Sequence, residues 1–180
     1  RQYTLVLSYP EELRRLYDSN PEARSFVLAY HREKDEAHPV DLSHYKHSED
    51  VPLFLQWDIR WGFEEYAGEC AAASACGPLC LSMVGYHLTK DESRFSPDKV
   101  IEFSKDKGYG VRGIGTSWSL MSEGAAELGL NSEVLPLDEN IMINALEQGR
   151  PIILIMGPGK FTTSGHFIVL CSYKNGKFTV

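Results

Sequence analysis

The sequence lacks a hydrophobic run long enough to cross a membrane. A bilayer-spanning helix needs about 20 consecutive apolar residues. The longest apolar run here covers residues 151–156, which is the length of a strand. We therefore expect no integral membrane segment in this chain.

Cysteine and basic runs are also scarce. The four cysteines are too few for a small domain stabilised mainly by disulfide bonds. No Lys/Arg-rich run occurs and the net charge is −7, so nucleic acid and anionic membranes are poor candidate partners. The chain has 180 residues, of which 43% are hydrophobic and 24% charged. This length and composition are typical of one globular domain with a sizeable core.

Prolines and apolar spacing divide the chain into two parts. Residues 10–18 and a segment from Pro21 predict two short helices. Residues 31–50 are polar and contain four histidines whose spacing matches no compact metal site, which favours a solvated linker. We expect an N-terminal helical extension and linker over residues 1–50, and one domain over residues 51–180.

The order of predicted elements in the second part indicates the α+β class, because helices come first and an antiparallel sheet follows. Asn175-Gly176 predicts a hairpin between the last two strands. The helices are expected at residues 76–88, 97–107, 117–128 and 139–148, the last two capped by Ser117 and Asp138. The strands are expected at residues 131–135, 151–156, 165–173 and from 177 onward. The run at residues 151–156 predicts a buried strand.

Residues 74–84 hold the most informative pattern. Pro78 suits the first turn of a helix, and the apolar residues that follow lie on nearly every face, which predicts a buried helix. Cys76 would lie at the positive end of that helix, where a thiol is expected to lose its proton easily. A small buried cysteine without a chemical role fits the same pattern equally well.

A cysteine nucleophile requires a histidine base and donors for the developing oxyanion. His87 lies about 16 Å along the helix from Cys76, which is too far. His166, at the start of a strand after a glycine-containing loop, is therefore the candidate base. Gln56 and the backbone N–H of Cys76 are candidate oxyanion donors. Taken singly, His166 and Gln56 are equally explained as ordinary polar residues at strand ends.

Four motifs taken together resemble the C-thirty-nine-like family of cysteine peptidases, which have a papain-like fold and occur widely in Gram-positive bacteria. They are residues 56–62 (QWDIRWG), 74–78 (SACGP), 116–118 (TSW) and 161–170 (FTTSGHFIVL). The resemblance covers residues 51–180, and the N-terminal helix pair is similar to the leader of some members.

The resemblance implies that Cys76 is the nucleophile, His166 the general base and acid, and Gln56 an oxyanion-hole donor. It implies a helical half that carries the cysteine, a sheet half that carries the histidine, and a cleft between them. It further implies a peptide or protein substrate, no metal or organic cofactor, and a secreted or cell-surface location. The acidic or amide residue that orients the histidine in this family is expected beyond Val180, because Asn175 belongs to the hairpin turn.

Three alternatives remain open at this point. The same fold could cleave a peptidoglycan cross-link as a cell-wall amidase or endopeptidase, or could serve as a papain-like binding domain without catalysis. A zinc site formed by Cys76, Cys80, Cys171 and His166 is the third, although its spacing is unlike that of structural zinc sites. Substrate specificity and oligomeric state are not predicted. The start at Arg1 leads us to expect a fragment or a processed form, and no signal peptide is visible.

Overall fold

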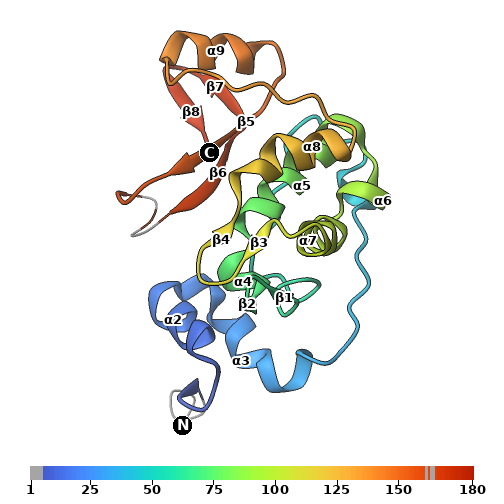
Figure 1. Cartoon of the computed structure of the whole chain (residues 1–180), viewed down its shortest axis with the longest axis vertical. Coiled ribbons are helices and arrows are strands. Elements are labelled where there is room, and N and C mark those ends of the chain that lie inside the picture. The colour runs from blue at the N-terminus through green and yellow to red at the C-terminus, as the bar shows by residue number, and fades with distance from the viewer. Residues whose placement is uncertain (1–5, 161, 163–164) are drawn as a thin grey trace.

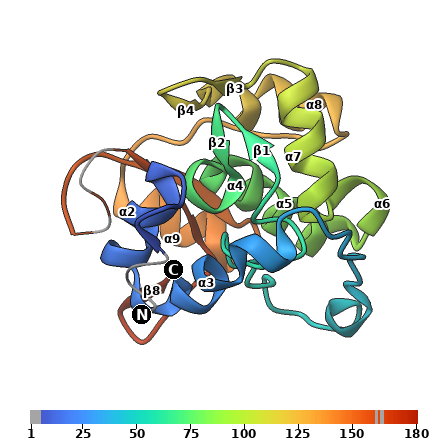
Figure 2. The same cartoon turned by 90° about the horizontal axis from the view of Figure 1, so that it is seen from below.

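The computed structural model describes residues 6–160, 162 and 165–180. A body of helices lies in the middle of the molecule, with two β-hairpins and α9 on one side and the N-terminal helices at one end (Figure 1). The view from below shows the same N-terminal helices beside α4 (Figure 2). Helices account for 44% of the described residues and strands for 14%, which confirms the α+β class.

The α-helices of the described chain are α2 (Glu11–Ser19), α3 (Arg24–Glu33), α4 (Ala71–Ser74), α5 (Cys76–Thr89), α6 (Glu92–Phe95), α7 (Pro97–Asp106), α8 (Glu123–Glu127) and α9 (Glu139–Glu147). The 3₁₀ turns are η1 (Pro21–Ala23), η2 (Ser43–Tyr45) and η3 (Trp118–Met121). The strands are β1 (Glu65–Tyr66), β2 (Glu69–Cys70), β3 (Gly110–Val111), β4 (Gly115–Thr116), β5 (Ile152–Met156), β6 (His166–Leu170), β7 (Ser172–Lys174) and β8 (Lys177–Thr179). None of the described helices combines the length and the apolar character needed to span a bilayer.

Helix α5 is the buried centre of the fold, as its apolar sequence predicts. It packs against α6 and α7 on one side and against β6 on another. Leu81 and Tyr86 are almost fully buried within it, and the Tyr86 hydroxyl donates to the carbonyl of Leu42 at 3.0 Å. The predicted linker is therefore anchored to the core at Leu42, which is fully buried within this otherwise polar stretch.

The strands form antiparallel pairs. In the pair β5–β6, Ile152 lies opposite Leu170 and Met156 opposite His166. Asn175 and Gly176 both have positive φ, which is the conformation of a type I′ turn, and they join β7 to β8 as predicted. The single strand expected at residues 165–173 is broken at Cys171, so β6 and β7 belong to separate two-stranded sheets.

The N-terminal helices share a hydrophobic cluster with the main domain. Leu13 of α2 and Val27 of α3 are fully buried in this cluster, together with Ala72 of α4. The rings of Phe26 and Phe63 are stacked with centroids 4.0 Å apart. Burial of each such side chain contributes about 1.5–3 kcal/mol, which fixes α2 and α3 against the body.

Two further predicted elements differ from the observed ones. Residues 131–135 form no strand, because no neighbouring strand pairs with them and Val134 is 92% exposed. The helix predicted at residues 117–128 is divided at Ser122 into η3 and α8. The hydroxyl of Ser117 bonds that of Ser119 and so does not cap a backbone N–H.

Elements nearer the C-terminus follow the prediction more closely. Asp138 caps α9 as expected, because its carboxylate accepts from the N–H of Ile141 at 3.1 Å. The strand predicted at residues 151–156 is present as β5, but it is only partly buried and Ile155 is 40% exposed.

Replacing Leu13 by alanine should destabilise the N-terminal cluster, because the residue is fully buried and the cavity left behind adds to the lost burial. We expect the free energy of unfolding to fall by about 2–5 kcal/mol, measured by urea unfolding with circular dichroism. Leu7→Ala is the matched control, since Leu7 is 56% exposed and should change stability by less than about 0.5 kcal/mol. Equal effects of the two substitutions would contradict the packing described above.

Candidate active site

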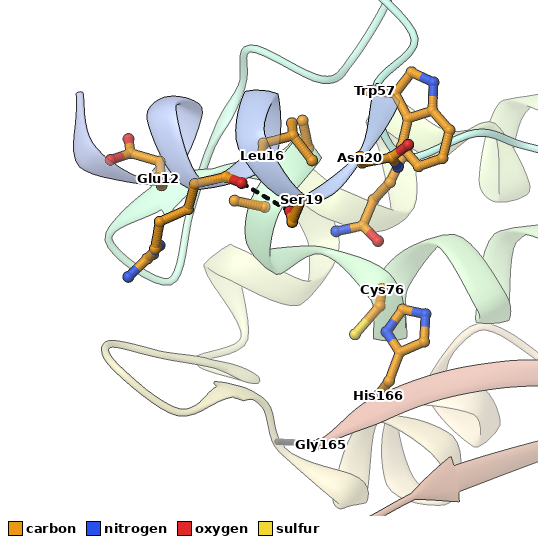
Figure 3. Close-up of a pocket in the computed structure, with 12 residues that line it drawn as sticks. Glu12, Leu16, Ser19, Asn20, Trp57, Cys76, Gly165 and His166 are labelled. Atoms are coloured by element: carbon orange, nitrogen blue, oxygen red, sulfur yellow. Dashed lines mark hydrogen bonds between the residues drawn. The ribbon is translucent and has the colours of Figure 1, made fainter. Parts of the chain in front are cut away.

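A pocket of about 360 Å³ brings together segments that lie far apart in the sequence. Figure 3 shows Cys76 and His166 side by side on one wall, with α2 opposite them. The residues that line the pocket are Glu12, Arg15, Leu16, Ser19, Asn20, Gln56, Trp57, Ala72, Ala73, Cys76, Gly165 and His166. All three residues predicted from the sequence, Cys76, His166 and Gln56, therefore line one pocket. Residues Phe161, Thr163 and Ser164 of the fourth motif lie outside the described part of the chain.

Cys76 is the first residue of α5, as its position before Pro78 predicts. The first backbone N–H groups of a helix have no partner inside the helix, and Pro78 has no N–H to contribute. The N–H groups of Cys76 and Gly77 act on the Cys76 sulfur, and so does the N–H of Phe167 on β6. The sulfur thus lies where the buried helix and β6 meet.

Burial raises the pKa of the Cys76 thiol, although the backbone N–H groups of Phe167, Gly77 and Cys76 act in the opposite direction. The expectation that the helix terminus would let this thiol ionise easily is therefore wrong for the resting protein. Loss of hydration disfavours the thiolate more than the N–H groups favour it. Burial also lowers the pKa of His166, since the charged imidazolium is disfavoured for the same reason.

These two shifts predict a neutral thiol beside a neutral imidazole at pH 7. Consistent with this, no hydrogen bond joins the Cys76 sulfur to the His166 ring in the described structure. Among the described residues, none accepts a hydrogen bond from the His166 ring either. The residue that would orient His166 stays a prediction.

Gln56 is held by one of its two amide hydrogens. Its Nε2 donates to the carbonyl of Ala71, the first residue of α4, at 3.0 Å. A primary amide carries two N–H donors, so the second remains available to a ligand in the pocket. The bond to Ala71 fixes the amide relative to the segment that leads into Cys76, which is the kind of preorganisation that an oxyanion donor requires.

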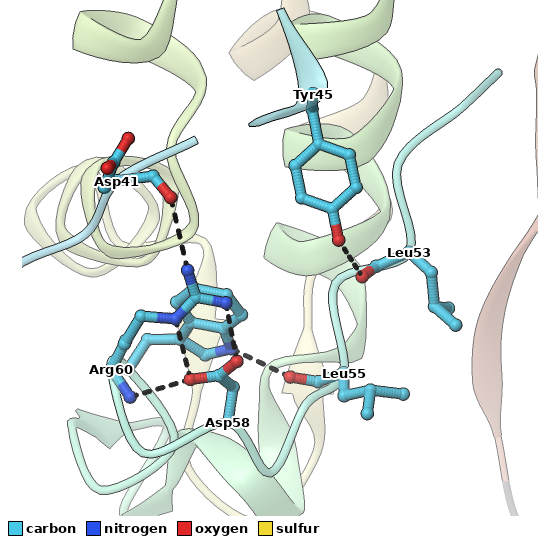
Figure 4. A network of polar contacts seen from close by, with 7 residues as sticks. Asp41, Tyr45, Leu53, Leu55, Asp58 and Arg60 are labelled. Carbon is cyan, nitrogen blue, oxygen red and sulfur yellow. Dashed lines mark hydrogen bonds and ion pairs between the residues drawn. The ribbon is translucent and has the colours of Figure 1, made fainter. Parts of the chain in front are cut away.

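The loop that carries Gln56 is fixed by a polar network on its far side (Figure 4). Trp61 Nε1 donates to the carbonyl of Leu55 at 2.9 Å. The guanidinium of Arg60 forms a bidentate ion pair with Asp58, with distances of 2.9 and 2.7 Å, and lies 4.5 Å from the centre of the Trp61 ring. Bidentate, stacked arginine contacts are geometrically specific, so this network restricts how far Gln56 can move.

Strand β4 presses against the first turn of α5. A Cβ atom on Gly77 would lie 2.6–2.7 Å from the side chain of Thr116, so only glycine allows this approach. Thr116 is in turn hydrogen-bonded to the hydroxyl of the fully buried Tyr66, which also bonds Ser104 at 2.8 Å. The position of Cys76 is therefore fixed from the β4 side as well as from β6.

None of the remaining cysteines lines the pocket, although Cys76 itself packs against the cluster that contains Cys80. Cys80 is buried in a cluster with Phe167 and Val169 against which Cys171 also packs, in agreement with its predicted core position. Burial raises the pKa of Cys70 to about 12. Within the described residues, no three His, Cys, Asp or Glu side chains are grouped so that they could hold a metal ion.

One wall of the pocket, formed by α2, carries no motif in the sequence. Glu12, Leu16 and Ser19 lie on one face of α2 at intervals of four and three residues, and Asn20 follows directly. This spacing indicates that the residues share one face of a helix. Because the face is of mixed polarity and the helix is short, the sequence does not indicate which part of the fold the face packs against. Trp57, next to Gln56, also lines the pocket.

The raised pKa of Cys76 predicts how alkylation of this residue depends on pH. Only the thiolate reacts with iodoacetamide, so the rate at Cys76 should keep rising above pH 7 and level off only above pH 9. The rate is measured at each pH by mass spectrometry that localises the modified residue. The same protein unfolded in urea is the control and should follow the ordinary thiol pKa. A plateau reached below pH 7 would show a resting thiolate and contradict the neutral pair.

Comparisons with known proteins do not identify the pocket. No protein-family model matches the chain, and searches of curated proteins and of solved structures likewise gave no match. The chemistry of the pocket must therefore be judged from its residues and their geometry.

Proposed function

We propose that this chain is a cysteine peptidase with a papain-like fold, of the C-thirty-nine-like type that its motifs resemble. The observation that carries the proposal is the pocket shared by Cys76, His166 and Gln56. These residues come from α5, from β6 and from a loop more than a hundred residues before β6. A thiol, an imidazole and a fixed amide donor that converge on one open pocket suit acyl transfer.

In the first half of the proposed reaction, the Cys76 sulfur attacks the carbonyl carbon of a substrate amide. Its proton passes to His166, which the lowered pKa keeps neutral and able to accept it. The carbonyl oxygen becomes an oxyanion, and the N–H of Cys76 and the second N–H of Gln56 Nε2 stabilise it. The intermediate collapses, the C–N bond breaks, and the leaving amine takes the proton from His166. A thioester remains on Cys76.

In the second half, His166 removes a proton from a water molecule as the water oxygen attacks the thioester carbon. The C–S bond then breaks, the carboxylic acid leaves, and His166 returns the proton to the sulfur. Each atom of the protein ends as it began, so no redox change is involved. A neutral resting pair suits this cycle, because the proton moves only when the carbonyl is attacked.

One observation favours a second candidate function, a papain-like binding domain without catalysis. In the described structure, His166 has no hydrogen-bond partner and makes no bond to Cys76. An unoriented histidine lowers the rate of such enzymes by orders of magnitude while leaving the pocket intact. A peptide would then bind in the pocket and remain uncleaved.

The proposed chemistry is tested by Cys76→Ala. We expect the wild-type protein to cleave members of an internally quenched peptide library, and Cys76→Ala to lose cleavage while its unfolding curve stays close to that of the wild type. Cys171→Ala is the control, since Cys171 lies outside the pocket lining. Cleavage by Cys76→Ala would rule out covalent catalysis at this residue. Release of fragments from purified cell wall, with peptides left intact, would instead assign the pocket to a peptidoglycan cross-link.

A second variant tests the oxyanion donor. Gln56→Ala removes the amide that Ala71 holds, and we expect kcat to fall by about a hundredfold, the effect of losing one such donor, with a smaller change in KM. Gln148→Ala is the matched control, because Gln148 bonds Asn144 at 3.1 Å and does not line the pocket. If Gln56→Ala raises KM and leaves kcat unchanged, the amide binds the ground state and does not stabilise an oxyanion.

A further inference from the structure

We propose that α2 forms a substrate subsite in which Glu12 selects a basic side chain, lysine or arginine, in the peptide that the pocket binds. This inference rests on the proposed function, since it names the substrate class of the same pocket. It is carried by residues of the N-terminal extension, which take no part in the chemistry described above.

Glu12 supplies a carboxylate that no basic side chain of the described structure contacts directly. The residue is half-buried on α2 and lines the pocket. No basic group of the described structure forms an ion pair or hydrogen bond with it. Figure 3 shows Glu12 at the end of α2 that is farther from Cys76. A partly desolvated carboxylate at the side of a pocket attracts a cationic group from a ligand.

The other charged groups of the pocket do not cancel this carboxylate. Arg15 is the basic side chain of the pocket lining, and it interacts with three carboxylates: it bonds Glu69, lies 3.8 Å from a carboxylate oxygen of Glu11, and feels the charge of Glu12. Burial lowers the pKa of His166, so His166 adds no positive charge at pH 7. Three carboxylates thus share one guanidinium, which leaves an excess of negative charge on this side of the pocket, and the net charge of −7 would help to draw basic peptides towards it.

The surface between Glu12 and the sulfur suits the apolar stem of a basic side chain. Leu16 lies one turn beyond Glu12, and Figure 3 shows it between Glu12 and Asn20 along α2. Ala72 and Ala73 line the same pocket. Lysine and arginine commonly bury their methylene stems against such apolar surface while the charged head stays at a polar rim.

Binding to the Cys76→Ala protein tests the subsite without depending on catalysis. Fluorescein-labelled decapeptides carry one lysine, one norleucine or one glutamate, moved through the sequence one position at a time. Binding is followed by fluorescence anisotropy in low salt. We expect the lysine peptide to bind about fivefold more tightly than its norleucine counterpart at one position, and Glu12→Gln to abolish that ratio. Glu11→Gln is the matched control, since Glu11 is also acidic and in the first turn of α2 but does not line the pocket.

The outcomes separate the subsite from the proposed chemistry. Lysine selectivity that Glu12→Gln removes and Glu11→Gln retains supports the subsite, even if the wild-type protein cleaves no peptide. Equal binding of lysine and norleucine peptides at every position overturns it, even if the wild-type protein cleaves both. Loss of selectivity in both variants would also overturn it, because the effect would then come from the general charge of α2.

Discussion

The close contact between β4 and the first turn of α5 is the constraint on which the pocket depends. Thr116 packs directly on the backbone at Gly77 and is held from behind by Tyr66, which is fully buried. On its other side, the same helix packs against β6. Cys76 at the start of α5 and His166 at the start of β6 are thus fixed by the core and not by flexible loops. Rigid elements hold reacting groups more accurately than loops do.

The burial that gives this precision also sets the protonation of the site. An isolated helix terminus favours a thiolate, but here the half-buried thiol loses part of its hydration, and this loss has the larger effect on the pKa of Cys76. His166 is affected in the opposite sense, so both groups are neutral. In the proposed reaction, charge separation is then postponed until a substrate carbonyl provides the place where negative charge can be stabilised by Gln56 and backbone N–H groups.

Local sequence signals predicted the elements that begin or turn at a characteristic residue, such as a proline, a capping aspartate or an Asn-Gly pair. Pro78 marked α5, Asp138 marked α9, and Asn175-Gly176 marked the last hairpin. The predictions failed where tertiary contacts decide the outcome. Residues 131–135 have the character of a strand but no partner, and burial reversed the expected pKa shift of Cys76. The candidate residues Cys76, His166 and Gln56 could be chosen from their motifs. The α2 wall of the pocket could not be predicted, because it depends on packing between distant segments, and residue spacing gives no information about such packing.

The place of α2 in the pocket has a consequence for how such a protein can diversify. The groups proposed for bond cleavage lie on α5, β6 and the Gln56 loop, whereas one wall of the pocket comes from a separate stretch at the start of the chain. Buried contacts around Leu13 attach this stretch to the body, and Leu16 belongs both to that cluster and to the pocket lining. Glu12, Ser19 and Asn20 line the pocket outside that cluster. These three polar residues can therefore change with little effect on the core, and a lineage can acquire new preferences while its reaction chemistry stays the same.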